Sequence, residues 1–334
     1  MTSTALIAHV AGDALERATS WADLPPDERR RRAVAACTSH DADALWQIAD
    51  AYLTLHGRAG ATVSAYTRRN YHQGVTALLV AWAREDLLHP RHDAAAVWLR
   101  HLEVAGRRAA RRTHGTPRGL APATITVHLA AARTLYKALR WTRATDAEPF
   151  TDVRPAPDQT APWDRRGPYG DDEVEELRRQ AAPIDQVLVL LAGHGGLRVG
   201  EIVALRWEDM SLPTRDVIVR AGKGGKQRRV TLSKSTVDAL ETLRMIAPVE
   251  NAADYMLPYR TTHEARARMR RLCARAGVPY KGIHSLRHTA GTRLFRETES
   301  MEDTARHLGH ASTDTTRVYA KWSNTRLHAT VGQW

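Results

Sequence analysis

Six side chains in the second half of the sequence have the types needed to break a phosphodiester bond without a metal ion. In the transition state of that reaction the non-bridging oxygens gain negative charge, and paired guanidinium groups match that geometry. A tyrosine phenolate can attack phosphorus and form a covalent ester, while an imidazole can take the tyrosine proton near neutral pH. The six candidates are, in chain order, Arg198, Lys223, His284, Arg287, His310 and Tyr319.

Local spacing places part of this set on elements that suit the chemistry. His284, Arg287 and His288 fall at positions i, i+3 and i+4, so a helix would present them on one face. Arg198 follows two glycines at the predicted start of a helix, where backbone can approach a ligand closely. Lys223 lies between glycines in GKGGK, a predicted hairpin turn from which its ammonium group can reach a departing sugar oxygen.

Each of these residues also has a plainer interpretation. Arg198 alone could be a surface arginine at a helix start, and GKGGK could be only a flexible turn. GKGGK is not a phosphate-binding P-loop, because Gln227 stands where that motif needs Ser or Thr. His310 could cap a helix after Gly309, and Tyr319 could be a core residue of an amphipathic helix. The functional interpretation therefore depends on the joint presence of these residue types in this order.

A zinc site is a further alternative for the histidine pair. His284 and His288 have the i, i+4 spacing of a zinc-binding helix, but the metalloprotease glutamate is missing and Arg287 on the same face would repel a cation. The two cysteines, Cys37 and Cys273, are far apart and form no CxxC pair. The sequence therefore predicts no metal site and no cofactor, and the lone cysteines fit a reducing compartment.

Composition favours duplex DNA as the partner. The 334 residues carry a formal net charge of +12, and the sequence pI is about 10.1. Such a surplus of positive charge favours a polyanion, and the presence of only two phenylalanines weakens the case for a single-strand binder built on aromatic stacking. No signal peptide or apolar run of membrane-spanning length occurs, so we expect no membrane contact and a cytoplasmic, nucleoid-associated location.

The elements that must position these side chains divide the chain into four predicted regions. Residues 1–40 form an N-terminal extension, residues 41–150 a helical domain, residues 151–168 a proline-rich linker, and residues 169–334 a second domain. In the helical domain, apolar periodicity predicts helices at 43–57, 62–88, 93–106 and 122–143.

The second domain is predicted to be mainly α with a small antiparallel β-sheet. Alternating residues in 216–222 and 228–233 flank GKGGKQ and indicate a β-hairpin. Within residues 196–210, a helix is predicted after the glycines. Further helices are predicted at 171–182, 235–246, 262–277, 284–297, 301–309 and 313–322.

These motifs together resemble the catalytic domain of the tyrosine recombinase (phage integrase) family, and within it the Xer-like recombinases. GLRVGEIVALRWEDM, GKGGKQRRVTLS, HSLRHTAGTRL and LGHASTDTTRVYA stand in the family's order, over roughly residues 170–322. More weakly, TVSAYTRRNY and PATITVHLAAARTLYKAL resemble the family's helical core-binding (SAM-like) domain. The resemblance implies a DNA-binding first domain and a tyrosine-recombinase catalytic domain.

The resemblance also implies how the phosphate is held. Arg198 and Arg287 would clamp the scissile phosphate, and His310 would donate a hydrogen bond to it. Glu201 would brace the site through hydrogen bonds to its neighbours, and His288 would support the site without taking part in chemistry.

The remaining roles concern proton and bond transfer. Tyr319 would attack phosphorus to give a 3′-phosphotyrosine and a free 5′ hydroxyl, with His284 assisting its deprotonation. Lys223 would protonate the 5′ oxygen, with Lys226 as the less favoured neighbour.

The implied function is site-specific DNA recombination in integration, excision or dimer resolution. Exchange between two duplexes would require self-association into a tetramer on paired sites, and the sequence leaves open whether an accessory recombinase or a directionality protein takes part. Two alternatives stand beside it: DNA relaxation of the type IB topoisomerase kind, and DNA binding without cutting.

Overall fold

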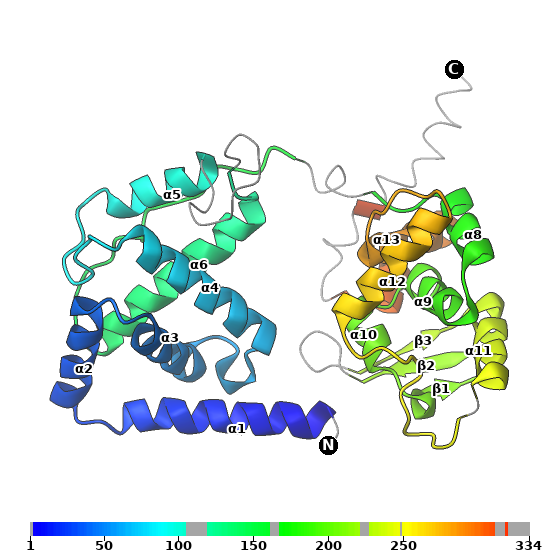
Figure 1. Ribbon diagram of the computed structural model, residues 1–334, viewed down its shortest axis with the longest axis horizontal. Coiled ribbons are helices and arrows are strands. Elements are labelled where there is room, and N and C mark those ends of the chain that lie inside the picture. Colours follow the sequence, from blue (N-terminus) through cyan, green and yellow to red (C-terminus); the bar gives the residue numbers. More distant parts are fainter. Residues whose placement is uncertain are drawn as a thin grey trace. The chain divides into compact units, whose positions relative to one another are not determined.

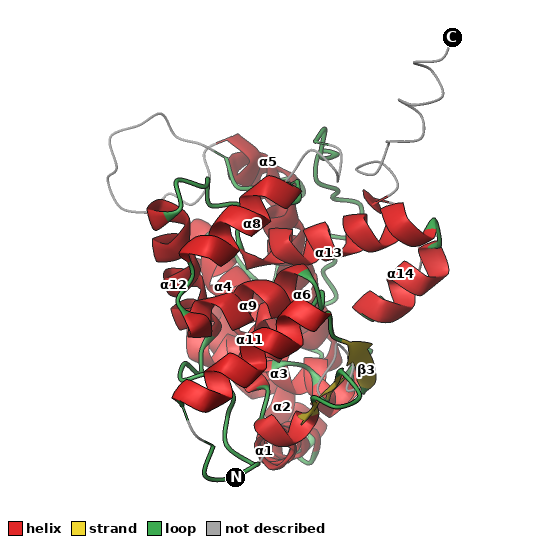
Figure 2. Cartoon of the chain, turned by 90° about the vertical axis from the view of Figure 1, so that its right-hand side faces the viewer, coloured by secondary structure: helices red, strands yellow, loops and turns green. Residues whose placement is uncertain are grey.

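The computed structural model describes residues 3–104, 119–160, 167–220, 227–247, 249–310 and 318–319. The chain divides into two compact units, Met1–Gln159 and Thr160–Trp334, and most of their helices and strands are labelled in Figure 1. Helices predominate and strands are confined to one small sheet (Figure 2), so the predicted fold class is confirmed. Within the described residues, none of the helices has the length and apolar character needed to cross a membrane.

The first unit is built around one long buried helix. This helix, α6, contacts α3, α4 and α5, and its buried face includes Leu129, Leu135 and Leu139. Phe150 stacks on Trp82 at 5.4 Å between ring centroids and closes this core. The elements of the unit are α1 (Ser3–Ala22), α2 (Pro26–Thr38), α3 (Ala42–His56), η1 (Gly60–Thr62), α4 (Ala65–Ala81), α5 (Ala94–Val104) and α6 (Pro122–Trp141).

All four helices predicted in this unit are present, but the second is shorter than its apolar pattern indicated. It begins after Ser64, whose side chain caps the helix, and it ends at Ala81 instead of continuing to 88. The ring Nε2 of His40 lies 3.2 Å from the carbonyl oxygen of Trp82 and 3.1 Å from that of Glu85. The His40 ring thus gives both carbonyl oxygens a hydrogen-bond partner, so they do not need the partners that a longer helix would supply.

Residues before 41 contribute two helices to the same unit. Both α1 and α2 contact α3, and Ala18, Ala33 and Cys37 are buried there. Because the side chains at this contact are small, the axes of α1 and α2 can lie close to that of α3. The extension predicted for 1–40 is therefore helical along most of its length.

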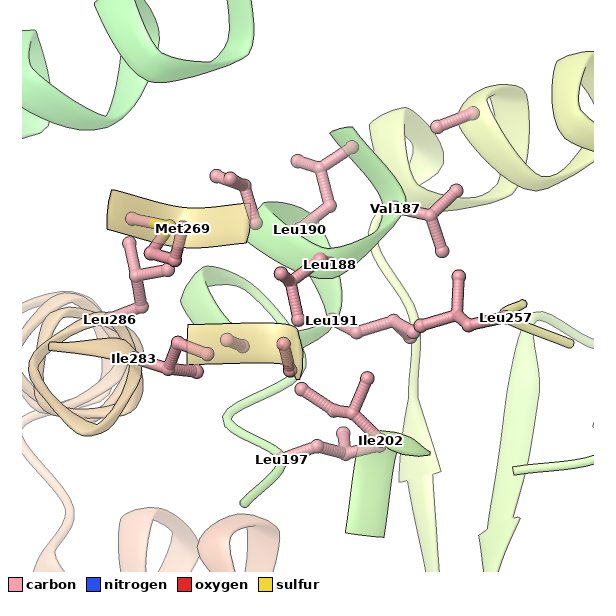
Figure 3. Packing of buried hydrophobic residues seen from close by; sticks show 14 of the residues in the cluster. Val187, Leu188, Leu190, Leu191, Leu197, Ile202, Leu257, Met269, Ile283 and Leu286 are labelled. Atoms are coloured by element: carbon pink, nitrogen blue, oxygen red, sulfur yellow. The ribbon is translucent and has the colours of Figure 1, made fainter. Parts of the chain in front are cut away.

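The second unit surrounds an apolar helix, α9. Leu188, Leu190 and Leu191 are completely buried on it, and Ile283 and Leu286 of α13 pack against the same core (Figure 3). Because α9 is apolar nearly all round, it lies inside the unit and not at its surface. The elements are α8 (Asp171–Gln180), α9 (Pro183–Gly193), α10 (Val199–Ala204), η2 (Trp207–Asp209), β1 (Met210–Ser211), β2 (Asp216–Val219), β3 (Arg228–Thr231), α11 (Lys234–Ile246), α12 (Thr262–Arg275), α13 (Ile283–Thr298) and α14 (Met301–Leu308).

The predicted hairpin is confirmed, and a third strand joins it. Strands pair antiparallel in the order β1-β2-β3, with Val217 opposite Val230. Sequence periodicity wrongly extended the α10 helix to residue 210. The helix ends at Ala204 because the following peptide groups pair elsewhere: Leu205 accepts a bond from the Met256 backbone at 3.0 Å.

Candidate active site

Helix α13 brings three of the predicted side chains to one face. His284, Arg287 and His288 occupy its first two turns, and the His284 and His288 rings lie 4.6 Å apart between centroids. Gly282 precedes the helix with φ of 94°, a backbone angle that favours glycine. The predicted i, i+3, i+4 face is therefore present.

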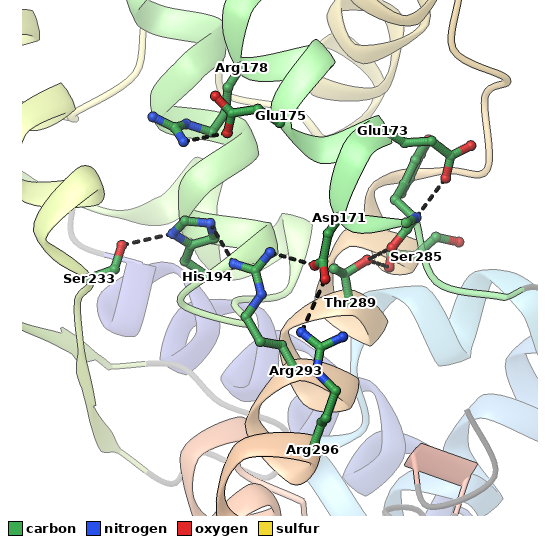
Figure 4. A network of polar contacts seen from close by, with 12 residues as sticks. Asp171, Glu173, Glu175, Arg178, His194, Ser233, Ser285, Thr289, Arg293 and Arg296 are labelled. Atoms are coloured by element: carbon green, nitrogen blue, oxygen red, sulfur yellow. Dashed lines mark hydrogen bonds and ion pairs between the residues drawn. The ribbon is translucent and has the colours of Figure 1, made fainter. Parts of the chain in front are cut away.

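The opposite face of α13 is fixed by polar contacts (Figure 4). Arg293 donates to the ring Nε2 of His194 at 3.1 Å and to Asp171 at 2.6 Å. Because a guanidinium group only donates, His194 Nε2 accepts and Nδ1 carries the proton that bonds to Ser233 Oγ at 2.9 Å. Arg296 also bonds to Asp171, so α13 is tied to α8, α9 and the start of α11. Sequence analysis identified none of these contacts.

Arg287 is a buried guanidinium that joins two distant turns. Only 1% of the residue is exposed, and its Nη1 and Nη2 donate to the carbonyl oxygens of Gly196 at 2.5 Å and Leu308 at 2.7 Å. Gly196 has φ of 64°, and a Cβ there would stand 2.4 Å from Leu308 Cδ2, so this turn requires glycine. Burial, followed by the charge of Arg198, lowers the pKa of Arg287 to about 10, which leaves it protonated at neutral pH.

Arg198 stands at the N-terminus of α10 and shares a carboxylate with its own helix. Glu201 accepts from the Arg198 backbone N–H at 2.8 Å and from Nη1 at 2.9 Å. The second terminal nitrogen of Arg198, Nη2, donates a hydrogen bond to the carbonyl oxygen of Gly309 at 3.4 Å. These bonds are the kind of bracing predicted for Glu201.

Arg228, the first residue of β3, is part of this cluster and was missed by sequence analysis. Its Nη1 and Nη2 each donate to a Glu201 oxygen at 2.8 Å, and its side chain is only 12% exposed. Burial raises the pKa of Glu201, but hydrogen bonds from Arg228 and Arg198 outweigh it and lower that pKa to about 2. The available signal was strand alternation, which puts residue 228 on the same inward face as buried Val230.

The turn after α14 carries His310. Gly309 ends the helix in the left-handed conformation with φ of 67°, and a Cβ at that position would meet the Arg228 side chain at 2.6 Å. The His310 backbone N–H bonds to Ala305 O at 2.9 Å, which fixes the turn. Its ring stacks with that of Tyr319 at 6.0 Å between centroids and 18° between planes.

Tyr319 is buried beside the histidines and arginines of its own chain. The residue is 1% exposed, and its ring lies 5.8 Å from that of His288 between centroids. It faces Gly291 of α13, where a Cβ would come within 2.6 Å of the ring. The nucleophile candidate therefore lies in the same pocket as the groups that would bind phosphate.

Burial is the main influence on the pKa values of the tyrosine and of two histidines in the pocket. It raises the pKa of Tyr319 to about 12, although Arg287 and Arg198 oppose that rise, so the phenol is neutral at physiological pH. Burial and the neighbouring cations lower the pKa of His310 to about 4 and that of His288 to about 3. The phenol therefore needs a base before it can attack, and the two imidazoles beside it carry no charge at neutral pH.

Most of the predicted set converges in the described structure. Lys223 and Lys226 fall in 221–226, outside the described residues, although β2 and β3 on either side form the predicted hairpin. The residues that the structure brings together are Arg198, Glu201, His284, Arg287, His288, His310 and Tyr319. This arrangement offers a cationic pocket for one phosphate, a phenol nucleophile and neutral imidazoles.

The contact between Gly291 and Tyr319 predicts that Gly291→Ala reduces strand cleavage without unfolding the protein. The added methyl group must displace the Tyr319 ring, whereas Ala favours the helix over Gly by about 1 kcal/mol. We expect the rate of covalent linkage to DNA to fall by about tenfold or more while Tm is kept or raised. Gly200→Ala in α10, with open space around its Cβ, is the matched control. Unchanged cleavage in Gly291→Ala would contradict the observed packing.

Three partly buried histidines that are neutral in the folded protein predict lower stability in mild acid. The pKa values of His194, His288 and His310 are lowered to about 4, 3 and 4, from 6.5. The unfolded chain binds protons at these positions near pH 6.5 and the folded protein does not, so the free energy of unfolding falls as pH decreases from 6.5 toward 4. We expect Tm, followed by circular dichroism, to drop by several degrees between about pH 7 and about pH 5. A constant Tm over this range would be inconsistent with histidines that stay neutral in the folded protein.

Known proteins resemble this chain in sequence. Residues 171–326 match the family model described as the Phage integrase family. Tyrosine recombinase XerC of Xanthomonas campestris pv. campestris (strain B100) is 28% identical over 309 residues, which cover 88% of this chain and 90% of the relative. Tyrosine recombinase XerC of Corynebacterium efficiens is 34% identical over 164 residues, covering 47% of this chain and 50% of the relative.

Solved structures share the fold. XerH site-specific recombinase bound to palindromic difH substrate, in a post-cleavage complex, aligns with a TM-score of 0.65 at 18% identity and covers 91% of this chain and 94% of its own. A lambda integrase dimer bound to a COC′ core site aligns with a TM-score of 0.62 at 16% identity, covering 81% and 75%. The likeness extends over both units of this chain.

Proposed function

We propose that this chain is a site-specific tyrosine recombinase that cuts and rejoins duplex DNA through Tyr319, a function supported by the match of residues 171–326 to the model of the Phage integrase family. The observation that carries the proposal is the position of the Tyr319 phenol beside Arg287, Arg198 and His310 of its own chain. A phenol next to fixed guanidinium groups is suited to attack on a bound phosphate.

Phosphate binding is the first step of the proposed reaction. Arg198 and Arg287 would hold the non-bridging oxygens, and His310 would add a hydrogen bond from its ring. The Arg287 side chain is already oriented by two carbonyl groups, so little rearrangement is needed when negative charge develops.

Bond exchange follows at the same phosphorus. The Tyr319 oxygen forms a bond to the 3′ phosphate, and its proton passes to the imidazole of His284. The bond from phosphorus to the 5′ oxygen breaks, and Lys223 supplies the proton that makes the 5′ hydroxyl. A 5′ hydroxyl of a partner duplex reverses the attack and releases tyrosine, so the phosphodiester energy is conserved.

The partner and assembly follow from this chemistry. Double-stranded DNA is the substrate, and exchange between two duplexes calls for a tetramer on paired sites, acting in the cytoplasm with the nucleoid. Relatives and structural neighbours are named as recombinases and an integrase, several of them bound to DNA, which favours recombination over relaxation or binding without cutting.

Covalent capture from a random library tests the function. The full chain is incubated with duplexes that carry random sequence upstream of a fixed nick, so that cleavage near the nick releases a short oligonucleotide and traps the enzyme. We expect SDS-resistant adducts enriched in one sequence with two inverted arms around a spacer. Adducts without sequence preference would favour a topoisomerase, and DNA binding without any adduct would overturn the proposal.

A further inference from the structure

Arg228 connects three segments that carry site residues. It begins β3; its guanidinium group holds Glu201 on α10; and its side chain packs against Gly309, beside His310. Nε of Arg228 is also buried and has no acceptor within the described residues. A side chain so placed affects both the geometry and the charge of the pocket.

The charge balance of the pocket is uneven. Among the described residues, the guanidinium groups of Arg198 and Arg228 pair with the carboxylate of Glu201, and that of Arg287 lies close enough for Glu201 to influence its pKa. Two positive charges therefore remain in excess. A phosphodiester carries one negative charge, and it gains more as the attacking oxygen bonds to phosphorus, so the excess matches the transition state more closely than the ground state.

Glu201 divides its hydrogen bonds unequally between the two arginines that touch it. Arg228 makes a two-pronged contact, with both distances at 2.8 Å. The Arg198 side chain makes one bond, at 2.9 Å, and its second terminal nitrogen lies 3.4 Å from the Gly309 carbonyl oxygen. The carboxylate is thus held mainly by Arg228, and most of the Arg198 fork is left for another acceptor.

We propose that Arg228 is a positioning residue that takes up the negative charge of Glu201, so that Arg198 keeps its positive charge and free N–H groups for the scissile phosphate. The inference rests on the proposed function and deepens it. Without Arg228, Glu201 pairs fully with Arg198, and the pocket loses one of its two excess charges.

Paired variants separate this charge role from a merely structural one. Arg228→Met leaves Glu201 to neutralise Arg198. The substrate is a nicked duplex that carries the sequence enriched by covalent capture and traps the enzyme after cleavage, and we expect its cleavage to slow by about 100-fold. The double variant Arg228→Met/Glu201→Gln removes both charges of the pair, and we expect its rate to return to within about tenfold of wild type. If Arg228 served only to anchor β3, the double variant would be as slow as Arg228→Met or slower, and the proposal would fail.

The neighbouring residue of the same strand provides a matched control. Arg229 is 65% exposed in its side chain and pairs with Asp216 at 3.3 Å, so Arg229→Met removes the same charge from β3 outside the pocket. We expect this variant to cleave at the wild-type rate. Arg228→Lys keeps the charge but loses the two-pronged contact, and its rate should lie between those of wild type and Arg228→Met. A Lys variant as slow as the Met variant would count against a charge role.

Binding of inorganic phosphate to the full chain gives a readout without DNA cleavage. Followed by ³¹P NMR, phosphate should bind about tenfold more weakly to Arg228→Met, with affinity regained in the double variant. Lack of adducts with wild-type protein would count against the proposed recombinase, while equal phosphate affinity in all three proteins would count against the role of Arg228. The two failures are therefore distinguishable.

Discussion

Tyr319→Phe is expected to abolish covalent linkage to DNA, with adduct formation reduced by about 10⁴-fold or more. The change removes only the oxygen that would bond to phosphorus. The ring that stacks on His310 and packs against Gly291 remains, so the pocket should keep its shape. Affinity for the captured duplex and Tm should both stay near wild-type values, because a single hydroxyl contributes about 1 kcal/mol to stability.

The measurement is the SDS-resistant adduct formed on the trapped duplex, together with DNA affinity from a gel-shift titration. Tyr280→Phe removes the same atom from a more exposed tyrosine of the second unit and should leave adduct formation unchanged. Adducts that persist in Tyr319→Phe would show that another nucleophile attacks the phosphate. Loss of both adduct and DNA binding would point to unfolding, which Tm would reveal.

Much of this site could be predicted from sequence because its residues lie in short motifs with their own local geometry. His284 and Arg287 share a helix turn, and Arg198 immediately precedes α10, two residues after Gly196. A combination of residue types that suits one reaction, such as paired arginines with a tyrosine, indicates that reaction even when the spatial arrangement is unknown. The hairpin was found for a similar reason, since alternation and turn residues are local signals.

The contacts that were missed are non-local. Arg228 meets Glu201 across 27 positions in the chain, and Arg293 meets His194 across 99. Local periodicity reports which face of an element is apolar, but it contains no information on which charged residue will lie opposite. The β1 strand was missed for the same reason, because that segment is a strand by virtue of its pairing with β2, in which Met210 lies opposite Val217 and Ser211 opposite Asp216.

Arg287→Met is expected to reduce adduct formation by about 10³-fold while changing stability little. Arg287 would contact the phosphate directly, and losing a preorganised donor of this kind costs about 10²–10³ in rate. Burial lowers the pKa of Arg287, which means that the folded state disfavours its charge. Methionine removes that penalty but leaves the carbonyl groups of Gly196 and Leu308 without their donor. These effects oppose each other, so Tm should stay within a few degrees of wild type.

Arg293→Met on the opposite face of α13 is the matched control. It loses an ion pair with Asp171 and the bond to His194, both of which lie on the side of α13 drawn in Figure 4. We expect Tm to fall while adduct formation on the trapped duplex stays within about threefold of wild type. The two variants of one helix should therefore behave in opposite ways, since Arg287 would bind phosphate with little net effect on stability, while Arg293 holds the helix in place. A large drop in Tm for Arg287→Met, with cleavage lost equally in Arg293→Met, would mean that both arginines serve the fold alone.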